Sequence, residues 1–160
     1  MENKAQIIRR FNEARDEVRG LLPKIDQHME IYPGWTIKEV LAHLAGWDDA
    51  TILALSAFLA GDAPPVPASR GIDPYNAQTV AERSDLNYEQ IIGEWNMVRD
   101  QLTPLLERLP DEKLTSTIVA PWGPTMTVAE LIKDMGEHEM EHAQVLRARL
   151  ADPDRPPAAH

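Results

Sequence analysis

The sequence contains no cysteine among its 160 residues. This absence excludes disulfides, thiolate zinc sites, iron–sulfur clusters and a cysteine nucleophile. Long apolar runs are missing as well. No stretch approaches the roughly 18 apolar residues that a membrane span needs, and no apolar run follows the first charges as it would in a secretory signal. We therefore expect a cytoplasmic protein without a membrane partner, and a reducing compartment suits a chain that lacks cysteine.

Basic residues are also scarce, with 16 Lys and Arg against 26 Asp and Glu, which gives a net charge of −10. Nucleic acids are bound largely through Lys and Arg, and no basic stripe interleaved with aromatic residues occurs here. We therefore expect no nucleic-acid partner. The length fits one domain, and a hydrophobic content of 43% allows a core that needs no metal merely to fold.

Apolar residues recur every three or four positions in four segments, which is typical of amphipathic helices. Two of these segments open with a Thr followed three residues later by a Glu, the capping-box pattern: Thr36 with Glu39, and Thr127 with Glu130. Gly61 is a plausible stop for the second segment. The pattern predicts helices over residues 5–22, 36–60, 87–109 and 127–150.

The connections between these segments differ in length and composition. Residues 62–86 form a long link whose first part is rich in proline, and such a link often crosses over a bundle or covers a site. Residues 115–127 suit an extended piece or a short hairpin. Together the segments predict an all-α four-helix bundle.

Three of the five histidines lie on the predicted helices. His138 and His142 take seam positions of the last helix where leucine would be expected, and their spacing of four places both rings on one face. Burying imidazoles without partners costs free energy, whereas two rings one turn apart suit one metal ion.

His43 borders the core face of the second helix. If the two helices pack together, it supplies a third ligand, and three ligands plus a water are the layout of a catalytic metal site. The alternative interpretation is that each of these histidines is a hydrogen-bonded core residue and binds no metal. We expect His28 and His160 to play no part.

Residues 138–142 also match the HExxH pattern of zinc proteases, in which Glu139 would be the general base. Most such proteases take a third ligand from further along the chain, and only 18 residues follow His142, so we discount this interpretation. Glu139 remains a candidate catalytic base or a group behind the ligands, or else a solvated helix-face charge. Asp134, one turn before His138, either orients a histidine or lies at the surface. Trp47 either walls the site or belongs to the plain core.

The segments GWTIKEVLAHLAGWDDA and HEMEHAQVLRARL resemble the second-helix and last-helix signatures of the DinB-like, or YfiT-like, superfamily of metalloproteins. The resemblance covers about residues 5–150 and implies an up-up-down-down bundle over residues 1–150, followed by a tail of residues 151–160 that we expect to be disordered. It also implies a homodimer and zinc or nickel bound by His43, His138 and His142. Many relatives carry a further histidine where this chain has Glu141, so any role of that histidine does not transfer.

Characterised relatives include thiol S-transferases, a mycothiol-dependent isomerase and small resistance hydrolases, so the resemblance does not choose a substrate. The leading hypothesis is a metal-dependent enzyme of the transferase or hydrolase type, in which the metal activates a water or a low-molecular-weight thiol against a small-molecule substrate. One alternative is a protein that binds or sequesters a small molecule, with a structural metal. The other is a metal-free helical interaction module.

Overall fold

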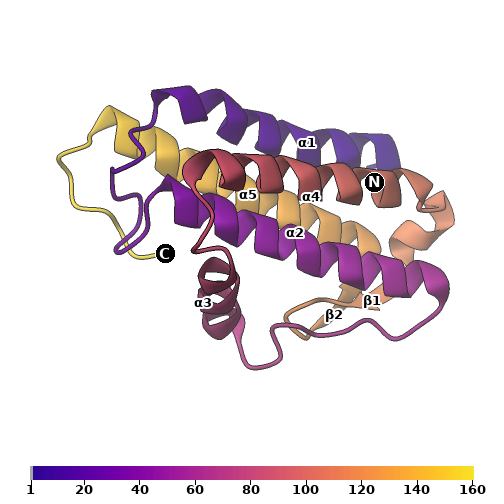
Figure 1. Ribbon diagram of the computed structural model, residues 1–160. Coiled ribbons are helices and arrows are strands. Elements are labelled where there is room, and N and C mark those ends of the chain that lie inside the picture. Colours follow the sequence, from indigo (N-terminus) through magenta and orange to yellow (C-terminus); the bar gives the residue numbers. More distant parts are fainter. Residues whose placement is uncertain (1) are drawn as a thin grey trace.

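The computed structural model describes residues 2–160, so the first residue of the expected domain lies outside them. Four long helices lie side by side along one axis (Figure 1). A shorter helix and a small hairpin cover one side of them. The elements are α1 Lys4–Leu21, α2 Ile37–Ala60, α3 Ile72–Glu82, α4 Tyr88–Arg108 and α5 Val128–Ala151, with 3₁₀ turns at Leu22–Lys24 and Asp111–Thr115 and strands β1 Thr117–Val119 and β2 Thr125–Thr127. The prediction of an all-α four-helix bundle with a long crossover is confirmed.

The helix directions run up-down-down-up, so the expected up-up-down-down order is wrong. The Lys4 ammonium donates to the carbonyls of Glu107 and Leu109, while Arg15 donates to the carbonyl of Trp95, so α1 is antiparallel to α4. Figure 1 shows α2 and α4 running the same way and α1 and α5 running the opposite way. The link after α1 folds into a turn at one end of the bundle, and this turn reverses the chain. The long crossover then has to carry it back along the bundle to begin α4.

The predicted helix ends are mostly where the sequence indicates. Thr127 and Glu130 form the full reciprocal capping box at the start of α5. Gly61 ends α2 in the left-handed conformation, at a φ of 80° that favours glycine. Thr36 does precede α2, but its hydroxyl donates to the Glu39 carboxylate at 2.9 Å instead of capping the backbone. The first of the two predicted capping boxes therefore forms neither of its backbone bonds, and its two side chains bond to each other.

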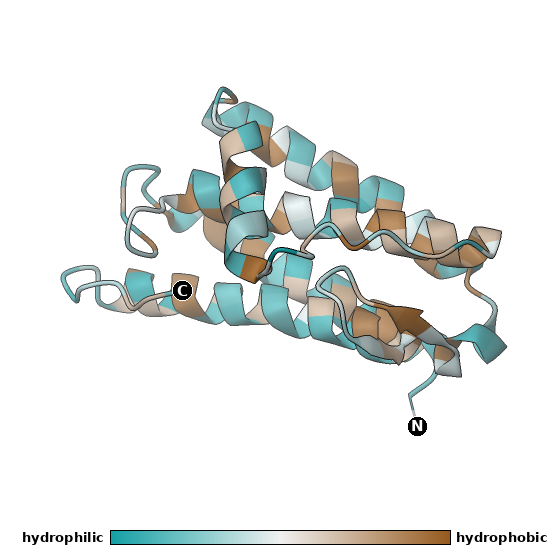
Figure 2. Ribbon diagram, turned by 90° about the horizontal axis from the view of Figure 1, so that it is seen from below, coloured by the Kyte–Doolittle hydropathy of each residue, from teal (hydrophilic) through white to brown (hydrophobic). Residues whose placement is uncertain are grey.

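Two apolar clusters fill the ends of the bundle, and a polar layer lies between them. Phe11, Leu102 and Leu131 belong to the first cluster, while Val18 and Ile91 belong to the second. The helices carry apolar and polar residues in alternating bands (Figure 2), as amphipathic helices do. The polar side chains buried between the clusters include Arg15, His43, Asp48, Arg99, Glu139 and His142. The middle of this bundle is therefore built from groups that need partners.

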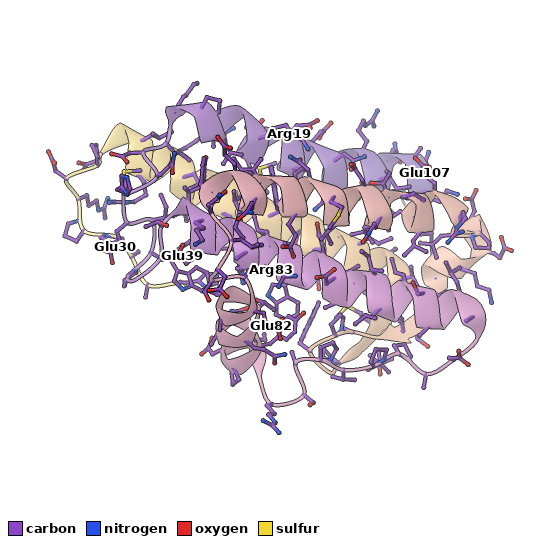
Figure 3. The ribbon with its side chains drawn as sticks, in the orientation of Figure 1. Arg19, Glu30, Glu39, Glu82, Arg83 and Glu107 are labelled. Carbon is purple, nitrogen blue, oxygen red and sulfur yellow. The ribbon has the colours of Figure 1, made fainter. Side chains whose placement is uncertain are left out.

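Helix α3 packs against the middle of α2 and so borders the polar layer. The Tyr75 hydroxyl donates to the Gly46 carbonyl at 2.7 Å. A Cβ on Gly46 would come within 2.5 Å of the Thr79 side chain, so the close approach requires glycine here. Arg83, labelled at the end of α3 in Figure 3, forms ion pairs with Asp49 of α2 and Glu94 of α4. These contacts hold α3 over the face of α2 that carries His43.

The link between α1 and α2 forms a tight turn at the end of the bundle. Tyr32 and Trp35 form an isolated bridge, and Gly34 between them has a φ of 80°. None of the helices within residues 2–160 combines the length and the apolar character that crossing a membrane requires.

Candidate metal centre

Three histidines converge between α2 and α5, within the polar layer. The Nε2 atom of His43 lies 3.0 Å from that of His138 and 3.2 Å from that of His142. The two Nε2 atoms of α5 lie 3.0 Å apart. His43 and His142 are almost fully buried, and His138 is half-buried. The spacing of four on α5 and the antiparallel packing of α2 therefore bring three ring nitrogens to one point.

Hydrogen bonds alone cannot satisfy this triangle of nitrogens. A ring nitrogen is either a donor or an acceptor, so at least two like groups must face each other whichever tautomers are present. A cation between the nitrogens removes this conflict. Two nitrogens bound to one zinc ion at their usual distances lie about 3.3 Å apart, close to the separations of His43, His138 and His142. The donor set therefore fits one divalent metal ion.

Tyr32 fixes the ring of one of these histidines. Its hydroxyl lies 2.7 Å from Nδ1 of His142, and both side chains are buried. When Nε2 serves as the ligand, Nδ1 carries the proton and donates to the tyrosine oxygen. Burial and the nearby Glu141 carboxylate raise the pKa of Tyr32, so this hydroxyl stays neutral. The tight turn that holds Tyr32 is thus part of the site.

The surroundings keep the three imidazoles neutral, which is the form that binds metals. Burial and the neighbouring His138 lower the pKa of His43 to about 2. Burial, with a contribution from His160, lowers the pKa of His138 to about 4. Burial and the other rings also move the pKa of His142 well below its usual value. All three nitrogens therefore offer lone pairs at neutral pH.

Glu139 lies behind the histidines, within an ion cluster that we define as Arg15, Asp48, Arg99 and Glu139. Each of the four long helices contributes one of these residues. Both carboxylate oxygens of Glu139 accept hydrogen bonds from the two arginines, and Asp48 pairs with both as well. Burial would raise the pKa of Glu139, but Arg99 and Arg15 outweigh it and hold the pKa below its usual value. The structure thus places Glu139 out of solvent, with both carboxylate oxygens bound by arginines.

A cavity of about 330 Å³ opens beside the histidines. Trp47 and Asp134, two of the residues singled out from the sequence, both line it. The Trp47 indole donates to the Asn76 side chain at 2.8 Å, which fixes the ring at the wall. Asp134 is half-buried, and burial raises its pKa. Among the described residues it makes no hydrogen bond to a histidine, so its place is in the wall. The lining also includes Ile72, Asp73, Trp122, Met135 and His160.

His160 lies against the cluster, although we expected it to play no part. Its ring centroid is 4.9 Å from that of His43, 5.0 Å from His142 and 4.8 Å from Tyr32. One ligand atom from each of the four histidines lies within 4.8 Å of the others. Periodicity could not find His160 or Tyr32, because both lie outside helices. The arginine partners of Glu139 could have been suspected from the sequence, since each is a charged residue at a position within an apolar stripe.

Comparison with known proteins agrees with the fold and identifies the family. A model of the DinB superfamily matches residues 30–146. No match was found among curated proteins. The crystal structure of an uncharacterised protein from Escherichia coli UTI89 is similar with a TM-score of 0.76 and 16% identity, over 96% of both chains. That of a mycothiol-dependent maleylpyruvate isomerase is similar with a TM-score of 0.73 and 18% identity, over 91% of this chain and 63% of that one.

The two structural similarities, at these identities, show the fold, and the family match adds the sequence relationship. The matched residues run from the turn before α2 almost to the end of α5, so they contain all three converging histidines. The resemblance stated from the sequence is thereby confirmed. Because the match spans well over half of the chain, this protein belongs to the DinB superfamily.

Proposed function

We propose that this protein is a metal-dependent enzyme acting on small molecules, with His43, His138 and His142 as the ligands of one divalent metal. The observation that carries the proposal is the meeting of three neutral ring nitrogens at the wall of a cavity of about 330 Å³. A purely structural metal site is usually closed by four protein ligands inside the core. Here two of the three helical ligands, His43 and His138, line a space large enough for a substrate.

The walls of the cavity indicate what kind of substrate fits. Trp47 and Trp122 meet edge to face with ring centroids 5.9 Å apart, and they provide an aromatic surface. Asp73 and Asp134 add acidic groups to the same lining. An apolar or aromatic group can therefore pack on the tryptophans, whereas a strongly anionic body would be repelled by the carboxylates.

The remaining residues hold the ligands in place. Tyr32 orients the ring of His142, and Asn76 fixes Trp47. The ion cluster ties α5, through Glu139, to the three other long helices at the level of the ligands. In this proposal Glu139 acts through the position of His138 and transfers no proton itself.

A zinc or nickel ion held here would lower the pKa of a bound water or thiol and so supply a nucleophile at neutral pH. The similarity to a mycothiol-dependent isomerase supports a low-molecular-weight thiol as the second reactant. The proposed reaction is therefore either transfer of a thiol to an electrophilic small molecule or hydrolysis of that small molecule by a metal-bound water. The homodimer and the cytoplasmic location expected from the sequence stay predictions.

The test is ligand binding at the metal, followed by turnover. The protein is purified without a polyhistidine tag, loaded with Co²⁺ and titrated with a small thiol while its visible spectrum is recorded. The proposal expects a spectral change that saturates, and thiol-transfer or hydrolase activity that is absent from His43→Ala. A metal-loaded protein that binds neither thiols nor anions at the metal would contradict the enzyme proposal and favour a structural metal.

A further inference from the structure

The C-terminal tail, defined as residues 152–160, returns from the end of α5 to the histidine cluster. Figure 1 shows it curving back towards the turn before α2. Its starting point is anchored by the buried Arg149, whose guanidinium donates to the Glu30 carbonyl at 3.0 Å and to the carbonyls of Pro153 and Arg155. Figure 3 labels Glu30 at this end of the molecule. The tail therefore leaves α5 in a direction that these bonds fix.

Prolines restrict the path of the tail from this anchor to its last residue. Pro156 and Pro157 hold the backbone near an extended form and reduce the number of conformations that it can adopt. His160 then rests on two aromatic rings, with centroids 4.8 Å from Tyr32 and 5.1 Å from Trp35. Both rings come from the turn that also positions His142. The turn before α2 therefore positions both the ring of His160 and the ring of His142.

We propose that His160 is a fourth metal ligand, which the tail delivers to the site and which an incoming thiol or anion displaces. The inference rests on the proposed function, because it needs a metal held by the three helical histidines. One ligand atom of His160 lies within 4.8 Å of one atom of each of the others. Because ligand nitrogens of one zinc ion lie about 3.3 Å apart, the tail delivers this ring by a short movement towards the metal. No electron transfer is involved: one neutral imidazole leaves the metal and one donor atom takes its place.

The four ligands differ in how firmly the fold holds them. His43, His138 and His142 project from long helices, and two of the three are almost fully buried. His160 is exposed and lies on an irregular segment. Segments with few buried contacts open at the lowest free-energy cost. His160 is therefore the ligand that exchanges, and its exchange converts a closed site of four protein ligands into an open site of three.

A tethered ligand competes with every external one. If the tail occupies the fourth position for about nine-tenths of the time, the apparent affinity for a small anion falls about tenfold. The tether keeps the local concentration of the imidazole in the millimolar range. The tail would thus protect the metal from weak adventitious ligands while a substrate that also packs on the cavity walls displaces it.

The experiment compares Co²⁺-loaded wild-type protein, His160→Ala and His28→Ala. His28 is exposed and outside the cluster, which makes its variant a matched control. The visible Co²⁺ spectrum reports the ligand set, and azide titration reports access to the metal. We expect His160→Ala to keep one metal per chain, to show a changed spectrum and to bind azide about tenfold more tightly. His28→Ala should match the wild type.

A second variant separates loss of the ligand from loss of the tail's shape. Replacing Pro156 and Pro157 with glycine keeps His160 but loosens the tail, so azide affinity should rise by less than in His160→Ala. Identical spectra and azide affinities in wild type and His160→Ala, with metal still lost from His142→Ala, would overturn the fourth ligand and leave the proposed function standing. A wild-type protein that takes up no Co²⁺ would overturn both.

Discussion

Two polar clusters share the middle of the bundle, and they differ in whether their polar atoms satisfy one another. In the ion cluster two arginines face two carboxylates, so the charges balance and the bonds run between opposite partners. In the histidine cluster three like nitrogens face each other at 3.0–3.2 Å. The first cluster pairs its charges without any ligand, although Nη1 of Arg99 is buried there with no hydrogen-bond partner, whereas the second has a donor set that fits a cation.

This comparison changes the meaning of the HExxH pattern in this chain. Its two histidines turn to one side and its glutamate to another, because residues 138 and 142 share a helix face that residue 139 does not. The glutamate completes the ion cluster, while the histidines belong to the candidate metal centre. A motif that places ligands and base together in proteases is divided here between the ion cluster and the candidate metal centre.

The largest expected effect comes from breaking the balance of the ion cluster. Glu139→Ala leaves Arg15 and Arg99 buried beside a single carboxylate, and we expect the free energy of unfolding to fall by about 3–5 kcal/mol. Urea denaturation measures this change. The exposed Glu137 on the same helix supplies the control, since Glu137→Ala should cost less than about 0.5 kcal/mol. Equal effects of the two substitutions would contradict the structural role of the cluster.

Removing the metal tests the other cluster. With free metal at about 100 times its dissociation constant, binding to the folded state adds about 2.7 kcal/mol of stability, which a chelator should take away. Thermal denaturation with and without chelator measures this difference. The apo protein should remain helical, because two apolar clusters and the ion cluster hold it together. A chelator that leaves the melting temperature unchanged would argue against a bound metal.

Tyr32→Phe should affect the metal without affecting the ion cluster. Loss of the hydroxyl beside His142 Nδ1 removes the group that orients this ring, and we expect metal affinity to fall about 10–100-fold. Competition with a chromophoric chelator provides the measurement. Tyr88→Phe, at a half-buried position on α4, should leave the affinity unchanged. Equal affinities in both variants would remove Tyr32 from the site.

The pH dependence of the apo protein tests the histidine cluster without its metal. The folded state lowers the pKa of His43 to about 2 and that of His138 to about 4, whereas unfolded histidine titrates near 6.5. The unfolded chain therefore binds more protons below that pH, so stability is full above about 6.5 and falls as the pH drops towards 4. Denaturation of apo protein across this range checks the slope, and His43→Ala should make it shallower.

Much of the fold could be predicted from the sequence because helix signals are local. The capping box at Thr127, the stop at Gly61 and the apolar stripes place all four long helices within one or two residues. The directions of the helices could not be predicted, because they depend on how the link after α1 turns at Tyr32 and Gly34. A turn of this kind has no periodicity to detect.

The candidate site divides in the same way. The positions of His138 and His142 in a helical seam indicated a metal site, because imidazoles replaced the leucines that a core would use. His160 and Tyr32 lie in irregular segments and meet the cluster only through the folded chain. The alternative interpretation of Glu139 as a solvent-exposed charge on the helix face is wrong. Its burial depends on Arg15, which is 124 positions away in the sequence and which no local pattern connects to it.

The three-histidine centre is tested most directly by the metal content of the untagged protein, measured by mass spectrometry beside His43→Ala, His142→Ala and His28→Ala. We predict about one divalent metal per chain in the native protein and in His28→Ala, and almost none in the two cluster variants, with the helical circular dichroism preserved in all four. A native protein that stays empty after zinc and nickel reconstitution, or cluster variants that keep their metal, would contradict the three-histidine centre.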